Sequence, residues 1–198
     1  EGFEGAFPSG TWTVNGDPTW GADDFKPHTG LKSAWCANGG SAGLDPASDN
    51  YPNNMNAWMI YGPFDLSEAS GAEVLCNFWL ESQFDLDNLD FGASINGFNF
   101  FGTRVTGNSS GWQQYTLDLT RIDALGNPCG RSQVWIAFIF KSDSSGTYKG
   151  AFIDNIVLQM YRAPLPAAER QALIALYEST HGDTWYDNSG WKTPPLDT

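Results

Sequence analysis

The fold class is decided by residues 134–140, which read Val134-Trp135-Ile136-Ala137-Phe138-Ile139-Phe140. β-Branched and aromatic residues are enriched in strands, and this segment contains little else. Because successive side chains of an extended chain point to opposite faces, alternate residues share one face, and that face carries Val134, Ile136, Phe138 and Phe140. The segment therefore predicts a β-strand whose apolar face lies against a core.

Further segments of this kind recur between residues 11 and 161, and each is bounded by Gly, Asn, Asp, Ser or Pro. The dipeptide Asn96-Gly97 favours a tight turn with positive φ, and it should join residues 89–95 to residues 98–103 in a hairpin. No helical periodicity precedes residue 165, so the prediction is an all-β antiparallel sandwich. We expect its strands at residues 31–36, 57–61, 73–81, 89–95, 113–119, 133–140 and 151–160.

The composition is that of a globular protein, and it excludes several partners. Of the 198 residues, 41% are hydrophobic and 15% aromatic, and nine Trp, 22 Gly and 11 Pro favour the short strands and turns of an extracellular β-sandwich. Ten Lys+Arg against 23 Asp+Glu give a net charge of −13, which repels phosphate backbones and anionic membrane surfaces. No segment approaches the ~20 apolar residues of a membrane span. We therefore expect no nucleic acid partner and no membrane insertion.

The pattern changes after residue 161. Residues 162–166 read Arg-Ala-Pro-Leu-Pro, which predicts a stiff linker that ends the last strand. Helical spacing follows, because Leu173, Leu176 and Tyr177 fall at i, i+3 and i+4, and Gly182 lies just beyond as a C-terminal cap. We expect a sandwich at 1–161, a linker at 162–166, and a helix with a Trp-bearing loop at 167–198.

Cysteine use and the start of the chain bear on its cellular context. Cys36, Cys76 and Cys129 allow one disulfide in three possible pairings, with one thiol left over. Residues 1–5 lack an initiator Met and a positively charged, apolar leader. We interpret the chain as a mature protein or an excised fragment.

Residues 3–161 resemble the jelly-roll modules found beside secreted metalloproteases of the immune inhibitor A type, and more distantly MAM domains and carbohydrate-binding modules. The resemblance is carried, in order, by Phe3-Glu4-Gly5, His28-Thr29-Gly30, Ser33-Ala34-Trp35, residues 53–67, Gly111-Trp112, residues 134–138 and residues 150–158. It implies an antiparallel jelly-roll β-sandwich. That architecture hosts sugar binding, adhesion and scaffolding alike.

Residues 167–191 resemble the N-terminal cap of secreted leucine-rich repeat proteins. In that family the helix and loop cover the open end of the first repeat, whereas no repeat follows here. We interpret the segment as a remnant of a longer protein or as a cap on another surface, with an apolar patch at Leu173, Leu176, Tyr177, Trp185 and Trp191. The matching positions are Glu169, Ala172, Leu173, Leu176, Tyr177, Thr180, Gly182, Asp183, Trp185, Asn188, Gly190 and Trp191.

The resemblance of the main segment also implies a structural calcium site where the first strand meets the last. Ca²⁺ accepts about six to eight oxygen ligands of mixed type. A carboxylate in the otherwise apolar segment 151–158 is costly without a cation or hydrogen-bond donors. The alternative is that this carboxylate points outward or accepts backbone amides. The implied ligands are Glu4, the carbonyls of His28 to Gly30 with Ser33, and Asp154.

Other acidic residues offer weaker ion sites. Asp23 and Asp24 lie near the same turn and could replace Glu4 among the ligands. A second cluster alternates along one extended segment, but it lacks the Gly and distal Glu of an EF-hand loop. An acidic surface turn is the simpler interpretation of that cluster, which consists of Asp85, Asp87, Asn88 and Asp90.

Aromatic residues could form a carbohydrate platform, because a flat ring stacks on the apolar face of a pyranose while amides bond its hydroxyls. Packing within turns is the alternative for the loop aromatics. We assign to the core those that lie inside apolar strand patterns, namely Trp35, Trp58, Trp79 and Trp135. The platform candidates in loops or at strand edges are Trp20, Tyr51, Trp112 and Tyr148, with Asn54 and its neighbours Asn53 and Asn56.

Catalytic machinery is poorly supported. His28 and His181 are the chain's two histidines, and no Ser-His-Asp or zinc motif can be drawn around them. A glycosidase with two carboxylates stays open, because the separation of acids is invisible in sequence. The prediction is a protein that is not an enzyme.

Together these observations favour a non-catalytic, calcium-stabilised module, secreted or displayed on a cell surface, that binds glycans or proteins for a larger chain. One alternative is a building block of a surface filament, stalk or adhesin that assembles through contacts between copies. Another is an accessory domain of a secreted protease.

Overall fold

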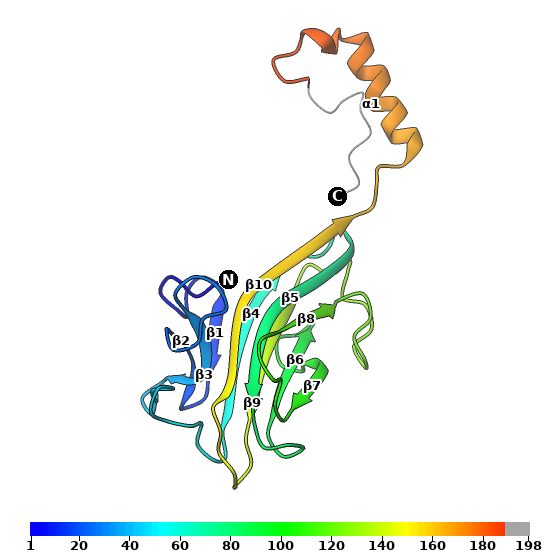
Figure 1. Cartoon of the computed structure of the whole chain (residues 1–198). Helices are drawn as coiled ribbons and strands as arrows, with labels where there is room; N and C mark the ends of the chain where they lie inside the picture. Colours follow the sequence, from blue (N-terminus) through cyan, green and yellow to red (C-terminus); the bar gives the residue numbers. More distant parts are fainter. Residues whose placement is uncertain (189–198) are drawn as a thin grey trace. The chain divides into compact units, whose positions relative to one another are not determined.

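Two five-stranded antiparallel sheets pack face to face in the computed structural model, which describes residues 1–188 (Figure 1). The fold class is therefore the predicted antiparallel β-sandwich. The first sheet has the order β1 (Trp12–Asn15), β4 (Asn56–Phe64), β9 (Val134–Lys141), β6 (Asn88–Ser94) and β7 (Phe101–Thr106). The second has the order β2 (Thr19–Asp23), β3 (Ser33–Gly39), β10 (Gly150–Arg162), β5 (Ala69–Glu81) and β8 (Gln113–Asp118).

The core lies between the sheets and is filled by alternate residues of the strands. In β9 the predicted face is confirmed, since Val134, Ile136, Phe138 and Phe140 are all buried. Ala137 and Ile139 are buried as well, although they belong to the opposite face. The cause is the central position of β9, which pairs with β4 on one side and β6 on the other, so that neighbouring side chains also cover its outer face.

Two strands are absent from the predicted set, and one turn is longer than predicted. β1 and β2 have only four and five residues, and the sequence of β2 includes Gly21 and Asp23. These two short strands form because β1 pairs with β4 and β2 pairs with β3. The hairpin of β6 and β7 is confirmed, but Ala93 pairs with Phe101, so residues 95–100 form a loop. Asn96 shapes this loop by accepting the N–H groups of Phe98 and Asn99 at 2.9 and 3.0 Å.

The chain divides into two compact units, Glu1–Met160 and Tyr161–Thr198. The second contains the helix α1 (Ala167–Ser179) and the short 3₁₀ helix η1 (Gly182–Thr184). Tyr177 is buried there against Trp185, with ring centroids 5.4 Å apart, whereas Leu173 and Leu176 are exposed. Of the predicted apolar patch, Trp191 lies outside the described residues. None of the helices within residues 1–188 has the length and apolar character that crossing a membrane requires.

All three cysteines are free thiols in the structure, so it contains none of the three possible disulfides. Cys36 and Cys76 are buried, and burial raises the pKa of each thiol to about 12. The thiolate is the reactive form of cysteine, so burial in the folded protein keeps Cys36 and Cys76 unreactive near neutral pH. Cys129 is half-buried.

We therefore expect Ellman's reagent to modify Cys129 first in the native protein and all three cysteines after unfolding in denaturant without reductant. The physical reason is that denaturation removes the burial that protects Cys36 and Cys76. A count of one thiol in denaturant would contradict the structure, because it would reveal a disulfide.

Candidate functional site

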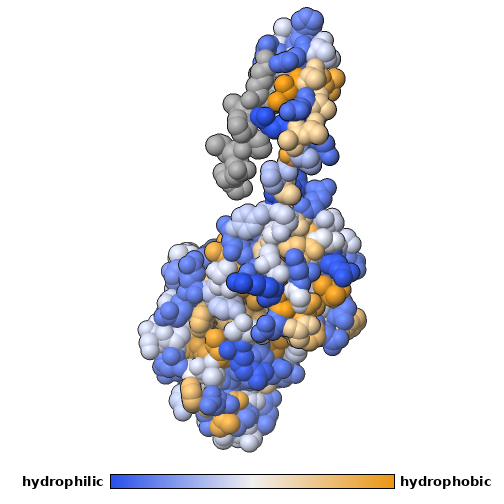
Figure 2. Space-filling view, turned by 90° about the vertical axis from the view of Figure 1, so that its right-hand side faces the viewer, coloured by the Kyte–Doolittle hydropathy of each residue, from blue (hydrophilic) through white to orange (hydrophobic). Residues whose placement is uncertain are grey.

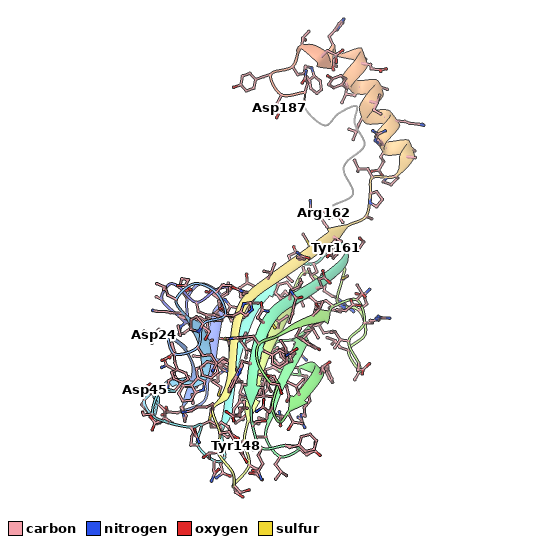
Figure 3. All side chains as sticks on the ribbon, in the orientation of Figure 1. Asp24, Asp45, Tyr148, Tyr161, Arg162 and Asp187 are labelled. Carbon is pink, nitrogen blue, oxygen red and sulfur yellow. The ribbon has the colours of Figure 1, made fainter. Side chains whose placement is uncertain are left out.

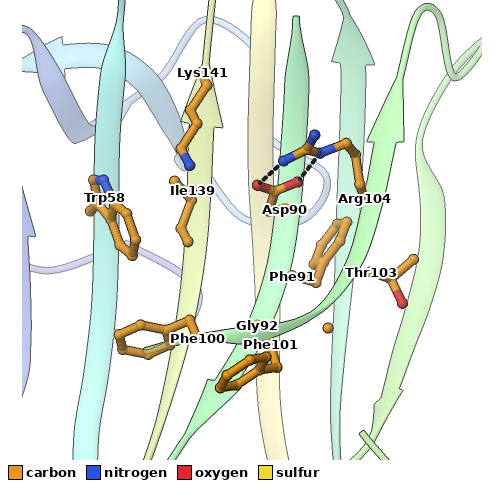
Figure 4. A pocket seen from close by; sticks show the side chains of 11 residues that line it. Trp58, Asp90, Phe91, Gly92, Phe100, Phe101, Thr103, Arg104, Ile139 and Lys141 are labelled. Atoms are coloured by element: carbon orange, nitrogen blue, oxygen red, sulfur yellow. Dashed lines mark hydrogen bonds and ion pairs between the residues drawn. The ribbon is translucent and has the colours of Figure 1, made fainter. Parts of the chain in front are cut away.

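A pocket of about 420 Å³ opens on the outer face of the first sheet, away from the core (Figure 4). Four strands build it through one row of residues in register. Trp58 on β4 pairs with Ile139 on β9, Ile139 pairs with Asp90 on β6, and Asp90 pairs with Arg104 on β7. Cross-strand partners share a face of the sheet, so this row brings an aromatic ring and an ion pair to one side. We call this pocket the groove.

Small residues form the floor of the groove, next to the row of Trp58, Ile139, Asp90 and Arg104. Ala137, Gly92 and Gly102 are cross-strand partners on β9, β6 and β7. A Cβ added at Gly92 would lie 3.2 Å from the Cβ of Phe100, tighter than ordinary contact. A side chain at Gly92 would therefore fill the space that Phe100 now borders. The floor of the groove is therefore formed mainly by backbone, because Gly92 and Gly102 have no side chain and Ala137 has only a methyl group.

The aromatic wall of the groove consists of Trp58 and Phe100. Their ring centroids lie 5.8 Å apart and their planes are inclined by 65°, the edge-to-face arrangement that aromatic pairs prefer. The indole Nε1–H of Trp58 donates to Oδ1 of Asn56 at 2.8 Å, which satisfies its polar atom. Trp58 is half-buried. The result is an oriented, partly exposed flat ring.

The polar wall carries two cations and one carboxylate. Arg104 binds Asp90 through Nε at 2.7 Å and Nη2 at 3.1 Å, shown as dashed lines in Figure 4. The hydrogen bond and the charge of Asp90 raise the pKa of Arg104. Lys141 holds its ammonium 5.5 Å from the centroid of the Trp58 ring. From the side shown in Figure 2, the sandwich surface is largely hydrophilic with hydrophobic patches between the polar residues.

The lining of the groove is suited to binding. Its single carboxylate, Asp90, is engaged by Arg104. Its other lining residues of the types that serve as base or nucleophile are Thr103 and Lys141. A glycosidase of the usual kind needs two carboxylates flanking the scissile bond. An aromatic ring beside fixed hydrogen-bonding groups is instead the arrangement that holds a ligand in place.

The structure corrects two of the predicted platform residues. Trp20 is fully buried and donates its Nε1–H to the carbonyl of Ala57 at 3.2 Å. Tyr51 is also fully buried, and its hydroxyl donates to the Asp87 carboxylate. Burial and this hydrogen bond raise the pKa of Tyr51. Both residues belong to the core, because their polar atoms find partners inside the sandwich, and neither ring is open to a ligand.

The remaining platform candidates do not form one surface. Trp112 is half-buried and contacts the ring of His28, with centroids 5.2 Å apart. Tyr148 is 42% exposed and lies at one tip of the sandwich (Figure 3). Asn54 is exposed and borders a different pocket, together with Asp17. None of the three lines the groove.

Trp58 and Trp135 were predicted to lie in the core, but both are half-buried and alternate with inward-facing residues. Ala57 and Met59 on β4 are buried, so Trp58 between them points outward. Because residues 57–61 are apolar on both faces, alternation alone does not show that Trp58 points outward. No local sequence pattern predicts that Phe100 and Arg104 lie near Trp58, because only the pairing of strands that are distant in sequence brings these residues together.

The implied calcium ligands converge on the loop before β3. Asp154 is fully buried, and its Oδ2 accepts the backbone N–H groups of His28 at 3.0 Å and Thr29 at 3.1 Å. Its Oδ1 accepts the N–H of Asn155 at 2.7 Å. Glu4 is exposed, and its Oε1 accepts the N–H groups of Leu31 and Lys32 at 2.9 and 3.2 Å, just after Gly30. Both carboxylates thus hold one loop through backbone donors.

These contacts test how well the region suits a cation. A carboxylate offers about four acceptor sites, and Asp154 uses three of them on N–H groups. Ser33 donates its hydroxyl to the carbonyl of Lys26 at 2.7 Å. Asp23 accepts from Phe25 and Asn38, and burial raises its pKa. Residues 1–188 contain no group of three or more His, Cys, Asp or Glu side chains that could hold a metal. A cation here would need mainly carbonyl oxygens besides Glu4 and Asp154.

The second acidic cluster separates in the structure. Asp87 is fully buried and accepts the N–H of Asp143 at 2.7 Å as well as the Tyr51 hydroxyl. Asp90 faces the groove with Arg104. Asp85 is exposed in the loop before β6. The acidic residues of this cluster therefore do not gather around one point, and the interpretation as a surface turn is wrong for Asp87, which is buried and serves the core.

Comparisons with known proteins identify the sandwich by its fold. No family model matches the chain, and no curated protein matches it. Among solved structures, TmCBM61 in complex with β-1,4-galactotriose has a TM-score of 0.52 and 17% identity, covering 80% of this chain and 94% of that one. The K1 cleaved adhesin domain of Lys-gingipain from Porphyromonas gingivalis has a TM-score of 0.54 and 15% identity, covering 81% and 96%. The K3 cleaved adhesin domain of the same protein has a TM-score of 0.53 and 13% identity, covering 80% of this chain and 97% of that one. The chain thus shares its β-sandwich fold with carbohydrate-binding and adhesin domains.

Proposed function

We propose that this chain is a non-catalytic glycan-binding module whose ligand lies in the groove. The observation that carries the proposal is the row Trp58, Ile139, Asp90 and Arg104. It offers a sugar ring a flat apolar surface and offers its hydroxyls a fixed acceptor and donor. One solved structure of this fold is described in complex with a galactotriose, which supports a saccharide as the ligand.

Screening the whole chain and its Trp58→Ala variant on immobilised glycans tests the proposal. Binding by the parent chain and loss of binding by the variant are the expected results. Glycan binding that does not depend on Trp58 would place the ligand elsewhere. The secreted or cell-surface location, assembly through copies and a role beside a protease stay predictions.

We also propose that calcium stabilises the sandwich at the loop before β3. Glu4 and Asp154 meeting at one loop, with His28 to Gly30 between them, support this assignment. Bound Ca²⁺ would cross-link the first residues to β10 and shield the two carboxylates from each other.

An ion that binds only the folded state raises the free energy of unfolding by about 2.7 kcal/mol when its free concentration is 100 times Kd. We therefore expect millimolar CaCl₂ to raise the melting temperature of the chain above its value in chelator, as measured by differential scanning calorimetry. Asp154→Ala should remove the response to calcium. Identical thermal curves with calcium and with chelator would overturn the calcium assignment and leave the backbone N–H groups as the partners of Asp154.

A further inference from the structure

The polar side of the groove has more hydrogen-bond donors than acceptors. Its charged donors are Lys141 and Arg104, and its one carboxylate is Asp90. Asn88 on β6, in register with Lys141 on β9, lies beside the groove but does not line it, and its Nδ2 is buried. A ligand in the groove therefore meets Lys141 and Arg104 as donors.

Lys141 contributes a positive charge to the groove that no carboxylate among the described residues neutralises. Among residues 1–188 the structure gives it no ion pair, and its ammonium lies over the Trp58 ring (Figure 4). A cation above an aromatic face keeps most of its hydrogen-bonding capacity, because the ring accepts none of its three N–H groups in the usual geometry. Lys141 can therefore donate to a ligand that stacks nearby.

Arg104 contributes further donors. Two of its five N–H groups bind Asp90, which leaves about three for a ligand. Its side chain is 62% exposed, so these groups are accessible. The charged residues that line the groove are Asp90, Arg104 and Lys141, and together they have one positive charge in excess.

This local excess contrasts with the net charge of −13 of the whole chain. At physiological salt the Debye length is about 8 Å, so acidic residues elsewhere on the surface are largely screened from a ligand in the groove. The charged donors that act at short range are those of Lys141 and Arg104. Hydrogen bonds from charged donors to carboxylates are about twice as strong as those between neutral groups.

We propose that the groove prefers glycans that contain a uronic acid, with the sugar ring stacked on Trp58 and its carboxylate bound by Lys141. Arg104 supplies donors to the adjoining hydroxyls. The inference rests on the proposed function, since it names the class of glycan that the same groove takes. A carboxylate provides the acceptors that these donors lack, whereas a neutral hydroxyl supplies weaker ones.

Calorimetric titration of the whole chain with matched glycans tests this preference. The probes are oligogalacturonates, oligoglucuronates and oligomannuronates, each compared with its carboxyl-reduced counterpart of the same linkage and length. We expect at least one acidic oligosaccharide to bind about tenfold more tightly than its reduced form, at 0.15 M salt. Lys141→Met should bring that ratio close to one, because it removes the cation that binds the carboxylate while keeping a side chain of similar length.

The matched control is Arg131→Met, which also removes one positive charge but lies before the first residue of β9, whereas Lys141 is its last. It should keep the preference for the acidic form. Reduced glycans that bind as tightly as the acidic ones, or a preference that survives Lys141→Met, would overturn the inference. Neutral binding that depends on Trp58 would then still support the proposed function, whereas no Trp58-dependent binding of any probe would remove both.

Discussion

Trp58→Ala is expected to weaken glycan binding by about 25-fold or more. Truncation of a tryptophan that dominates an interface costs about 2 kcal/mol or more, and each 1.4 kcal/mol is a factor of ten in Kd. Trp58 qualifies because its ring is oriented by Phe100 and by the hydrogen bond to Asn56, so little freedom is lost when a sugar stacks on it. Titration calorimetry with a glycan identified by array screening gives the measurement.

Trp112→Ala is the matched control for this prediction. Trp112 is also half-buried, but it contacts His28 and does not line the groove. Its removal should change Kd by less than about twofold, since it leaves the contacts in the groove intact. Thermal unfolding of both variants checks that each remains folded. If Trp112→Ala abolished binding and Trp58→Ala did not, the loop platform predicted from sequence would be the site.

Asp154→Ala is expected to produce the largest loss of stability among the variants considered. The change removes the acceptor of three backbone N–H groups, those of His28, Thr29 and Asn155. A donor left buried without a partner costs about 1–3 kcal/mol. Because these donors are only partly buried, water can reach some of them, and we expect a total loss of about 3 kcal/mol. For a domain of this size that corresponds to a fall in melting temperature of about 6–12 °C.

Measurements in chelator separate this loss from any contribution of calcium. Glu4→Ala is the matched control, because Glu4 holds the same loop but is exposed. Water can replace an exposed acceptor, so its removal should cost less than about 1 kcal/mol. Asp154→Asn keeps the volume of the side chain but turns one acceptor into a donor, and it should lose at least half as much stability as the Ala variant. Equal melting temperatures for the parent and Asp154→Ala would show that the loop does not depend on this carboxylate.

The sequence alone was sufficient for the fold class and for the need of the Asp154 carboxylate for partners. Alternation in residues 134–140 predicts a strand with a buried face, and the structure buries that face. A carboxylate within the apolar segment 151–158 demands either a cation or donors, and the structure supplies backbone donors. Both inferences rest on local chemistry, which is visible without knowing which strands pair.

The groove could not be inferred in this way, because its residues come from four strands. Residues 57–61 read Ala-Trp-Met-Ile-Tyr, which is apolar on both faces, so alternation by itself does not say which face Trp58 takes. A shift of one residue in register would move every side chain of a strand to the other face. Only the pairing of β4 with β9, of β9 with β6 and of β6 with β7 places Trp58, Asp90 and Arg104 in one row. Local residue patterns thus determined most of the strands and the buried face of β9, whereas long-range backbone hydrogen bonding decided which outward residues meet in the groove.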